Sequence, residues 1–148
     1  MEEEIKMEME KEMKHLEFVQ NVITRMNTNS FQVKGWAITI VSALLALFAN
    51  SSNSIYIFVA IVPTLVFWFL DAYYLLQERK FRGLYNDIID KKVDSFYMPI
   101  CNYKYDKKDS NSKKYCYWNV FKSTTIAPLY GVLILGLITG GILLEVFN

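Results

Sequence analysis

The sequence predicts an all-α membrane protein with three transmembrane helices, an N-terminal amphipathic helix and a helical extension of the second span. Two observations carry this prediction. Residues 35–70 and 123–144 contain no charged side chain, and an apolar run of about 18 residues or more is typical of a membrane-spanning helix. Hydrophobic residues make up 53% of the 148 residues, and they are concentrated in these runs.

The three expected spans cover residues 33–49, 55–76 and 126–144. The first is the shortest, about 26 Å of helix at about 1.5 Å per residue, and Lys34 stands at its start. The second is interrupted only by Asp71. Because a hydrocarbon core is about 30 Å thick, all three runs are long enough to cross it, the first with help from a flanking turn.

Lysine and arginine indicate the orientation. Five lie in residues 1–34 and eleven in residues 77–122, whereas none lies in residues 50–54 or after residue 122. Because positive residues stay on the cytoplasmic side, we expect the N-terminus and residues 77–122 in the cytoplasm. The C-terminus is then periplasmic or external. The opening sequence MEEEIK is acidic, whereas a signal peptide starts with a basic patch.

The first 26 residues predict an amphipathic helix. Seven glutamates against three lysines by residue 17 would be repelled by anionic lipid, so packing against other helices is favoured over lying on the membrane. Residues 27–30 prefer turns and predict a break, with Asn29 or Ser30 capping the next helix; one unbroken helix over residues 4–49 is the alternative. The apolar stripe recurs at helical spacing and comprises Ile5, Met9, Met13, Leu16, Val19, Ile23 and Met26.

Helical periodicity continues beyond the second span, which predicts one helix from about residue 55 to 94. Residues 96–122 are rich in aromatic residues and lysine, and they predict either a hairpin or an irregular loop. The expected organisation is a cytoplasmic amphipathic helix (1–30), two transmembrane helices (31–76), a cytoplasmic helix with a basic aromatic loop (77–122) and a third transmembrane helix (123–148).

Residues for enzyme or metal chemistry are not grouped along the sequence. His15 is the only histidine, and it is far in sequence from Cys101 and Cys116. Cytoplasmic thiols stay reduced, so a disulfide is not expected. No nucleophile has an evident base, and no glycine loop suits a phosphate. We therefore expect no catalysis, no metal and no cofactor.

Lys34 and Asp71 are expected at the same depth. Each is 16 residues from the end of its span at the short connection around residues 50–55, so antiparallel helices bring them level near the inner interface. An ionisable residue at this depth is unfavourable unless it is paired or hydrated. Two interpretations stay open, an intramembrane ion pair or a snorkelling lysine beside an aspartate among the headgroups.

The first span carries a stripe of small and weakly polar residues, which we call the small-residue stripe. Such a stripe permits close helix packing, or it lines a narrow pore in a symmetric oligomer. The third span has its own candidate packing face, Gly136 and Gly140 followed by Gly141, so the first span is freer to face a pore. The candidate pore-lining residues are Gly35, Thr39, Ser42, Ala46 and Asn50.

The loop YKYDKKDSNSKKYCYW interleaves lysines with aromatic residues. Lysines suit phosphates and aromatic rings stack on bases, so the loop is a candidate site for a nucleotide or oligonucleotide. The alternative is that these lysines follow the positive-inside rule or contact anionic lipid. The candidate ligand-binding residues are Tyr103, Lys104, Tyr105, Lys107, Lys108, Lys113, Lys114, Tyr117 and Trp118.

Two stretches carry a resemblance, LEFVQNVITRMNTNSFQVKGWAITIVSALLALFA and PTLVFWFLDAYYLLQERKFRGLY, with a fainter echo over residues 118–130. They resemble small bacterial membrane proteins associated with antiphage defence, namely the SLATT-like and Hailong-type membrane effectors. The resemblance implies an inner-membrane location and an oligomeric pore that opens on a nucleotide-derived signal. Opening of the pore would depolarise the infected cell, a form of defence called abortive infection.

The first hypothesis is therefore an oligomeric ion channel, with a tetramer as the first expectation. Its cytoplasmic helices hold the pore closed, and its partners are lipid, other copies of the chain and a nucleotide or oligonucleotide ligand. The second hypothesis is a non-conducting membrane anchor or adaptor, with the N-terminal helix docking a soluble defence partner.

Overall fold

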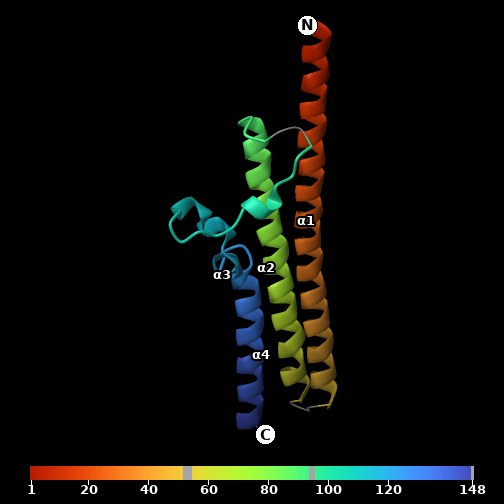
Figure 1. The fold of residues 1–148 in the computed structure, drawn as a ribbon. Helices are drawn as coiled ribbons and strands as arrows, with labels where there is room; N and C mark the ends of the chain where they lie inside the picture. The colour runs from red at the N-terminus through yellow and green to blue at the C-terminus, as the bar shows by residue number, and fades with distance from the viewer. Residues whose placement is uncertain (52–54, 94–95, 148) are drawn as a thin grey trace. The chain divides into compact units, whose positions relative to one another are not determined.

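The computed structural model describes residues 1–51, 55–93 and 96–147. These residues form six elements and no strand, which confirms the all-α expectation for this part of the chain. Helices α1 and α2 are each long and apolar enough to cross a membrane, and α4 carries a shorter apolar run, Ala127–Ile142. The elements are α1 (Glu2–Ser51), α2 (Ile55–Ile89), the 3-10 turns η1 (Ile100–Asn102) and η2 (Ser110–Tyr115), α3 (Tyr117–Phe121) and α4 (Ala127–Phe147) (Figure 1).

The chain forms two compact units, and α1 and α2 each contribute to both. Residues 1–29 and 74–120 form the first, which we call the charged unit. Residues 30–73 and 121–148 form the second, which we call the apolar unit. Each unit has a hydrophobic core of its own.

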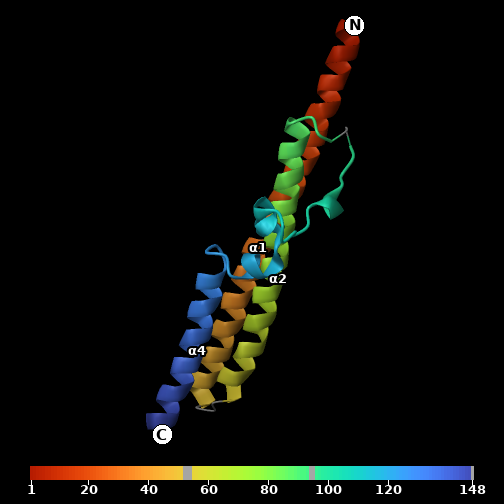
Figure 2. The ribbon, with the colours of Figure 1, turned by 60° about the vertical axis from the view of Figure 1, so that its left-hand side comes forward.

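In the apolar unit, parts of α1, α2 and α4 lie side by side (Figures 1 and 2). Val41 of α1, Ala60 of α2 and Leu137 of α4 belong to one buried core. Val33 and Ala37 are buried two turns and one turn before Val41. This four-residue spacing defines one packing face on α1.

Close packing of α4 uses only the last of the three expected glycines. A Cβ added at Gly141 would lie 3.6 Å from Ile57 of α2, which is ordinary van der Waals contact. A Cβ added at Gly136 or Gly140 would meet nothing within 4 Å. Within the described chain, α4 therefore packs through Leu137 and Gly141, and the expected Gly136–Gly140 face packs on none of it.

In the charged unit, α1 and α2 pack together with the loop that follows α2. The core joins Val19 and Ile23 of α1 to Leu84 and Ile88 of α2, and Tyr103 of the loop completes it. Residues 1–11 of α1 are all exposed and belong to no core. The apolar stripe of the N-terminal helix is thus covered over residues 16–23 and uncovered at Ile5, Met9 and Met13.

The expected break at residues 27–30 is wrong, because α1 is one continuous helix. Asn27 and Thr28 are exposed, so their low helix propensity costs only about 0.7 kcal/mol each. Burial of Ile23 and Val33 on either side outweighs that cost, since helices in proteins are stabilised mainly by packing. Ser30 does not cap a helix; its hydroxyl binds a side chain of α2.

The expected helical extension beyond residue 76 is confirmed, but its expected end near residue 94 is wrong, because α2 ends at Ile89. Lys91 adopts a left-handed conformation with φ of 54°. The Lys92 N–H donates to the Asp87 carbonyl at 2.8 Å, and the Lys91 N–H donates to the Ile88 carbonyl at 2.9 Å. This is a Schellman ending with lysine at the position where glycine is usual, so no glycine marks the end of this helix in the sequence.

Beyond residue 96 the described loop forms 3-10 turns and the short helix α3, so the hairpin alternative is not observed and the irregular one is. Gly83 of α2 lets this loop approach. A Cβ there would lie 2.3 Å from the Tyr115 hydroxyl and 2.9 Å from the Tyr103 ring. Both distances are shorter than real Cβ contacts, so a larger residue must displace the loop.

Gly83→Ala is expected to destabilise the charged unit by about 1–3 kcal/mol through overpacking, although alanine is intrinsically better in a helix by about 1 kcal/mol. The measurement is chemical unfolding of the full chain in detergent. Unfolding of the charged unit is detected by protease cleavage within residues 96–116. Gly136→Ala is the matched control, because its Cβ meets nothing within 4 Å. Equal stability of the two variants would contradict the tight fit at Gly83.

Candidate functional site

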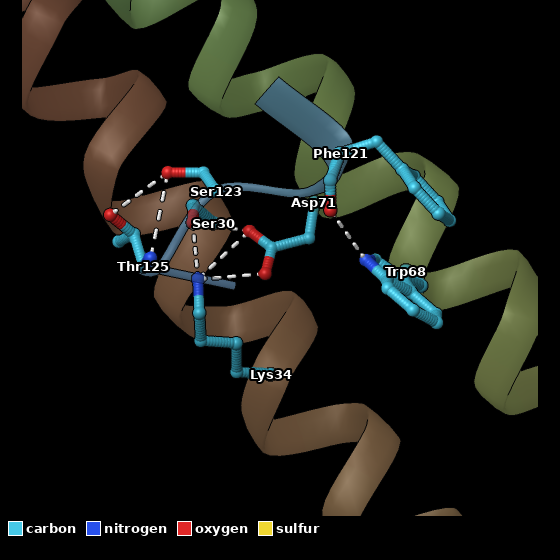
Figure 3. A network of polar contacts seen from close by, with 7 residues as sticks. All are labelled: Ser30, Lys34, Trp68, Asp71, Phe121, Ser123 and Thr125. Carbon is cyan, nitrogen blue, oxygen red and sulfur yellow. Dashed lines mark hydrogen bonds and ion pairs between the residues drawn. The ribbon is translucent and has the colours of Figure 1, made fainter. Parts of the chain in front are cut away.

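Lys34 of α1 and Asp71 of α2 form an ion pair in the apolar unit (Figure 3). Nζ of Lys34 lies 2.8 Å from one carboxylate oxygen of Asp71 and 2.9 Å from the other. The Asp71 side chain is fully buried, whereas that of Lys34 is 21% exposed. The two charges that the sequence placed level with each other are in direct contact.

Ser30 completes this site from one helical turn before Lys34. Its hydroxyl donates a hydrogen bond to Oδ1 of Asp71 and accepts one of 2.7 Å from Nζ of Lys34. Residues four apart lie on one face of a helix, so the continuous α1 presents both side chains to one carboxylate. Sequence analysis missed this role, although the four-residue spacing was a signal that could have found it.

Asp71 continues the buried face of α2. Ile57, Ala60 and Thr64 are buried at three- and four-residue spacing, and Asp71 follows two turns later. The Thr64 hydroxyl donates to the Ala60 carbonyl at 2.7 Å within its own helix. An unpaired carboxylate on such a face would be strongly unfavourable, which accounts for the two groups from α1 that bind Asp71.

The start of α4 and the residues before it cover the neighbouring turn of α2. The Trp68 ring stacks on Phe121 and Tyr130, with centroids 4.3 Å and 5.8 Å apart, and its Nε1–H donates to the Phe121 carbonyl at 3.1 Å (Figure 3). Tyr130 is fully buried, and by hydrogen-bond geometry its hydroxyl has no partner among the described residues. Sequence analysis gave Tyr130 no role.

The ion pair adds little to the free energy of folding, but it selects one geometry of α1 against α2. A buried ion pair gains about as much from attraction as it loses in desolvation, so it adds little over a well-packed apolar pair. Removing one partner costs about 3–5 kcal/mol, because the other charge is left buried alone. The site therefore fixes the rotation and register of α1 against α2.

The small-residue stripe lies on the opposite side of α1 from this site. At about 100° per residue, the stripe is centred roughly half a turn away from Val33, Ala37 and Val41, which are buried. The Thr39 hydroxyl donates to the Gly35 carbonyl at 2.9 Å. The stripe makes no close packing within the described chain, since all five members, Gly35, Thr39, Ser42, Ala46 and Asn50, are exposed.

In the charged unit, the structure divides the candidate ligand residues into two groups. Tyr103 is buried in the core, and its hydroxyl donates to Asp87 at 2.6 Å. Burial and this hydrogen bond raise the pKa of Tyr103 well above its usual range, so the phenol stays protonated. Tyr103 is therefore a packing residue in this conformation, and it is not available to stack on a base.

The remaining candidates lie nearer the surface. Lys104, Lys107 and Lys108 precede η2, and Lys113 and Lys114 lie within it; all five are exposed. Nζ of Lys114 lies 5.0 Å from the centre of the Tyr115 ring, a cation–π contact. Tyr105 and Trp118 are exposed, Tyr117 is half-buried, and the Tyr117 and Trp118 rings meet edge to face.

No group of three or more His, Cys, Asp or Glu side chains in residues 1–51, 55–93 and 96–147 is arranged to hold a metal ion. Cys101 is exposed and Cys116 half-buried, and both are free thiols.

Lys34→Met is expected to destabilise the apolar unit by about 3–5 kcal/mol, because it leaves the buried Asp71 carboxylate without its cation, and Asp71→Asn is expected to destabilise it less, because Lys34 is only half-buried. The double variant, with Lys34→Met and Asp71→Leu, should lose less than either single one. Unfolding in detergent, arranged as a double-mutant cycle, measures this. Lys92→Met, three residues after the end of α2, is the control, and little change is expected because its ion pair with Asp90 is exposed. Additive losses would exclude a coupled pair.

Comparison with protein families, curated proteins and solved structures finds no match for this chain. Any function must therefore be inferred from the residues of the site. Two features are relevant. One is the buried ion pair, which fixes α1 against α2, and the other is the small-residue stripe, which is exposed on the opposite side of α1.

Proposed function

We propose that the chain is one subunit of an oligomeric pore in the bacterial inner membrane. Three spans, formed from the apolar parts of α1, α2 and α4, cross the bilayer, and the charged unit lies in the cytoplasm. The pore is closed at rest. A nucleotide-derived ligand opens it, ions flow and the cell is depolarised as a defence against phage.

One observation carries this proposal, the two-sided character of α1. One face is fixed to α2 by Lys34 and Asp71 and by the buried core. The opposite face carries Gly35, Thr39 and Ser42 and is exposed. A face turned only toward lipid has no need of small polar residues, because lipid tails favour large apolar side chains. Such residues suit a neighbouring copy or a narrow aqueous path.

In this proposal, the charged unit contains the ligand site that controls opening of the pore. Its exposed lysines follow α2 and lead into α3 and α4, so a ligand held there is connected through the chain to the apolar unit. A ligand opens a pore only if it binds the open state more tightly than the closed one. Anionic nucleotides match the charge of the lysines.

A second candidate function is a membrane adaptor that does not conduct. It is favoured by residues 1–11, which are exposed, helical and carry Ile5 and Met9 on one stripe. Deleting residues 1–11 separates the two functions without disturbing the core around Val19. Loss of partner capture without a leak supports the adaptor, whereas a leak that needs no ligand supports a pore restrained by this segment.

Ser42→Trp is expected to reduce ion flux at least about tenfold and to leave the oligomer mass unchanged, because a bulky ring on the small-residue stripe obstructs a path lined by α1. The measurement is potassium flux from proteoliposomes in the presence of mono- and cyclic dinucleotides, with oligomer mass from light scattering. Leu135→Trp, on an exposed position of α4, is the control. Loss of assembly in Ser42→Trp would assign the stripe to packing. Absence of flux in the unmutated protein and normal membrane potential in cells would reject the pore.

Replacing Lys107, Lys108, Lys113 and Lys114 with alanine is expected to weaken nucleotide binding at least about tenfold, since each lost phosphate contact removes part of the electrostatic attraction. Calorimetric titration at low and high salt checks this, and the slope of affinity against salt should fall in the variant. The control replaces Lys6, Lys11 and Lys14 of α1 with alanine. If the affinities of the detergent-solubilised protein for nucleotides and for a soluble short-chain anionic lipid are both unchanged, the lysines serve neither ligand nor lipid. Loss of affinity for the anionic lipid alone assigns them to lipid.

A further inference from the structure

His15 joins α1 to the loop that follows α2 in the charged unit. It is the only histidine of the sequence, and its side chain is fully buried. Its Nδ1 accepts a hydrogen bond of 3.1 Å from the backbone N–H of Phe96. The two rings stack with centroids 5.5 Å apart and planes 25° apart. Residues separated by 81 positions are thus joined at this point.

This geometry requires the neutral imidazole. An acceptor at Nδ1 needs a free lone pair, so the proton of the neutral ring is on Nε2. Nε2 is buried and has no hydrogen-bond partner among the described residues. Burial lowers the pKa of His15 below its ordinary value of 6.5, which agrees with a ring that accepts and carries no charge.

The charges around His15 are mixed in sign. His15 lines a cavity of about 440 Å³, whose charged lining residues are Glu8, Lys11 and Glu12 of α1 and Lys91 after α2. Two carboxylates and two ammonium groups oppose each other, so neither sign dominates and burial decides the direction. Asp94 is a further charged residue near Phe96 in sequence, and it lies outside the described residues.

The loop is held at this point in a strained conformation. Phe96 has φ of 64°, in the left-handed region that non-glycine residues rarely adopt. Such a conformation persists only when surrounding contacts stabilise it. Stacking on His15 and the hydrogen bond to Nδ1 are contacts of this kind.

We propose that His15 is a pH-sensitive latch that holds the loop beginning at Phe96 against α1 at neutral pH and releases it in acid. Protonation places a hydrogen on Nδ1, so the Phe96 N–H loses its acceptor and faces a second donor. The imidazolium is also buried without a hydrogen-bonded anion. Tyr103, bound to Asp87, still anchors the loop further on, so release is local to residues 96–102.

The sign of the pH dependence follows from the pKa. Because the pKa of latched His15 is below 6.5, the released state binds more protons than the latched state. The latch contributes its full stability above about pH 6.5 and loses it progressively as the pH falls. This inference concerns the charged unit alone and does not rest on the proposed pore function.

The test is hydrogen–deuterium exchange of the full chain in lipid nanodiscs, at about pH 7.5 and about pH 5.5, corrected for the intrinsic exchange rate. Protection of residues 96–102 should fall several-fold, up to about tenfold, in acid, because protonation of a released imidazole with the ordinary pKa of 6.5 favours release by at most about tenfold between these two pH values. Protection of residues 81–88 in α2 should stay constant. Constant protection of residues 96–102 in the unmutated protein would overturn the proposal.

Variants separate the imidazole from its neighbours. His15→Gln keeps an acceptor that does not titrate, so residues 96–102 should stay protected at both pH values. His15→Phe keeps the stacking and removes the acceptor, so they should be unprotected at both. Glu12→Gln and Asp94→Asn should keep the pH dependence of the unmutated protein. Its loss in either variant would assign the switch to a carboxylate.

One measurement needs no variant. Because the chain has one histidine, its imidazole gives a single NMR titration in selectively labelled protein. The midpoint should lie below 6.5 and coincide with the pH at which the Phe96 amide loses protection. A midpoint at or above the ordinary histidine value, or one separated from the loss of protection, would reject the latch.

Discussion

The ion pair between Lys34 and Asp71 is the constraint on which the arrangement of the apolar unit depends. A carboxylate buried among apolar side chains cannot stay charged without partners, and here both partners come from one face of α1. Only one rotation of α1 brings Ser30 and Lys34 to Asp71. That rotation also buries Val33, Ala37 and Val41 and leaves the small-residue stripe exposed. The polar site and the apolar core therefore select the same geometry.

The continuity of α1 also depends on tertiary contacts. Residues 27–29 favour turns, but no proline or glycine interrupts them, and buried residues on both sides hold the helix. Because Ser30 lies four residues before Lys34 on an unbroken helix, both reach one carboxylate. A break at this position would have rotated Ser30 away from Asp71. The helix passes from the charged unit into the apolar unit without a change in its hydrogen-bonding pattern.

In the charged unit, the loop after α2 is held against the helices by its aromatic residues more than by its charges. Tyr103 packs beside Gly83 and binds Asp87, while Phe96 stacks on His15. The lysines lie on the outside of this framework. Aromatic rings interleaved with lysines in the sequence thus separate in space, some rings into the core and the cations to the surface. The same pattern would have suited a base-stacking surface, and the sequence could not distinguish the two.

The sequence alone determined the helical class, the apolar runs and the level placement of Lys34 and Asp71, because these depend on periodicity and on counting residues along two antiparallel helices. It also marked the small-residue stripe. Tertiary structure decided the unbroken α1, the end of α2 at Ile89, the role of Ser30 as a partner of Asp71, and the burial of Tyr130, His15 and Tyr103. These depend on contacts between residues distant in sequence, whose packing overrides local preferences of about 1 kcal/mol or less. The exposed position of the stripe belongs to the same class, since only the packing of α2 and α4 settles which face of α1 stays uncovered.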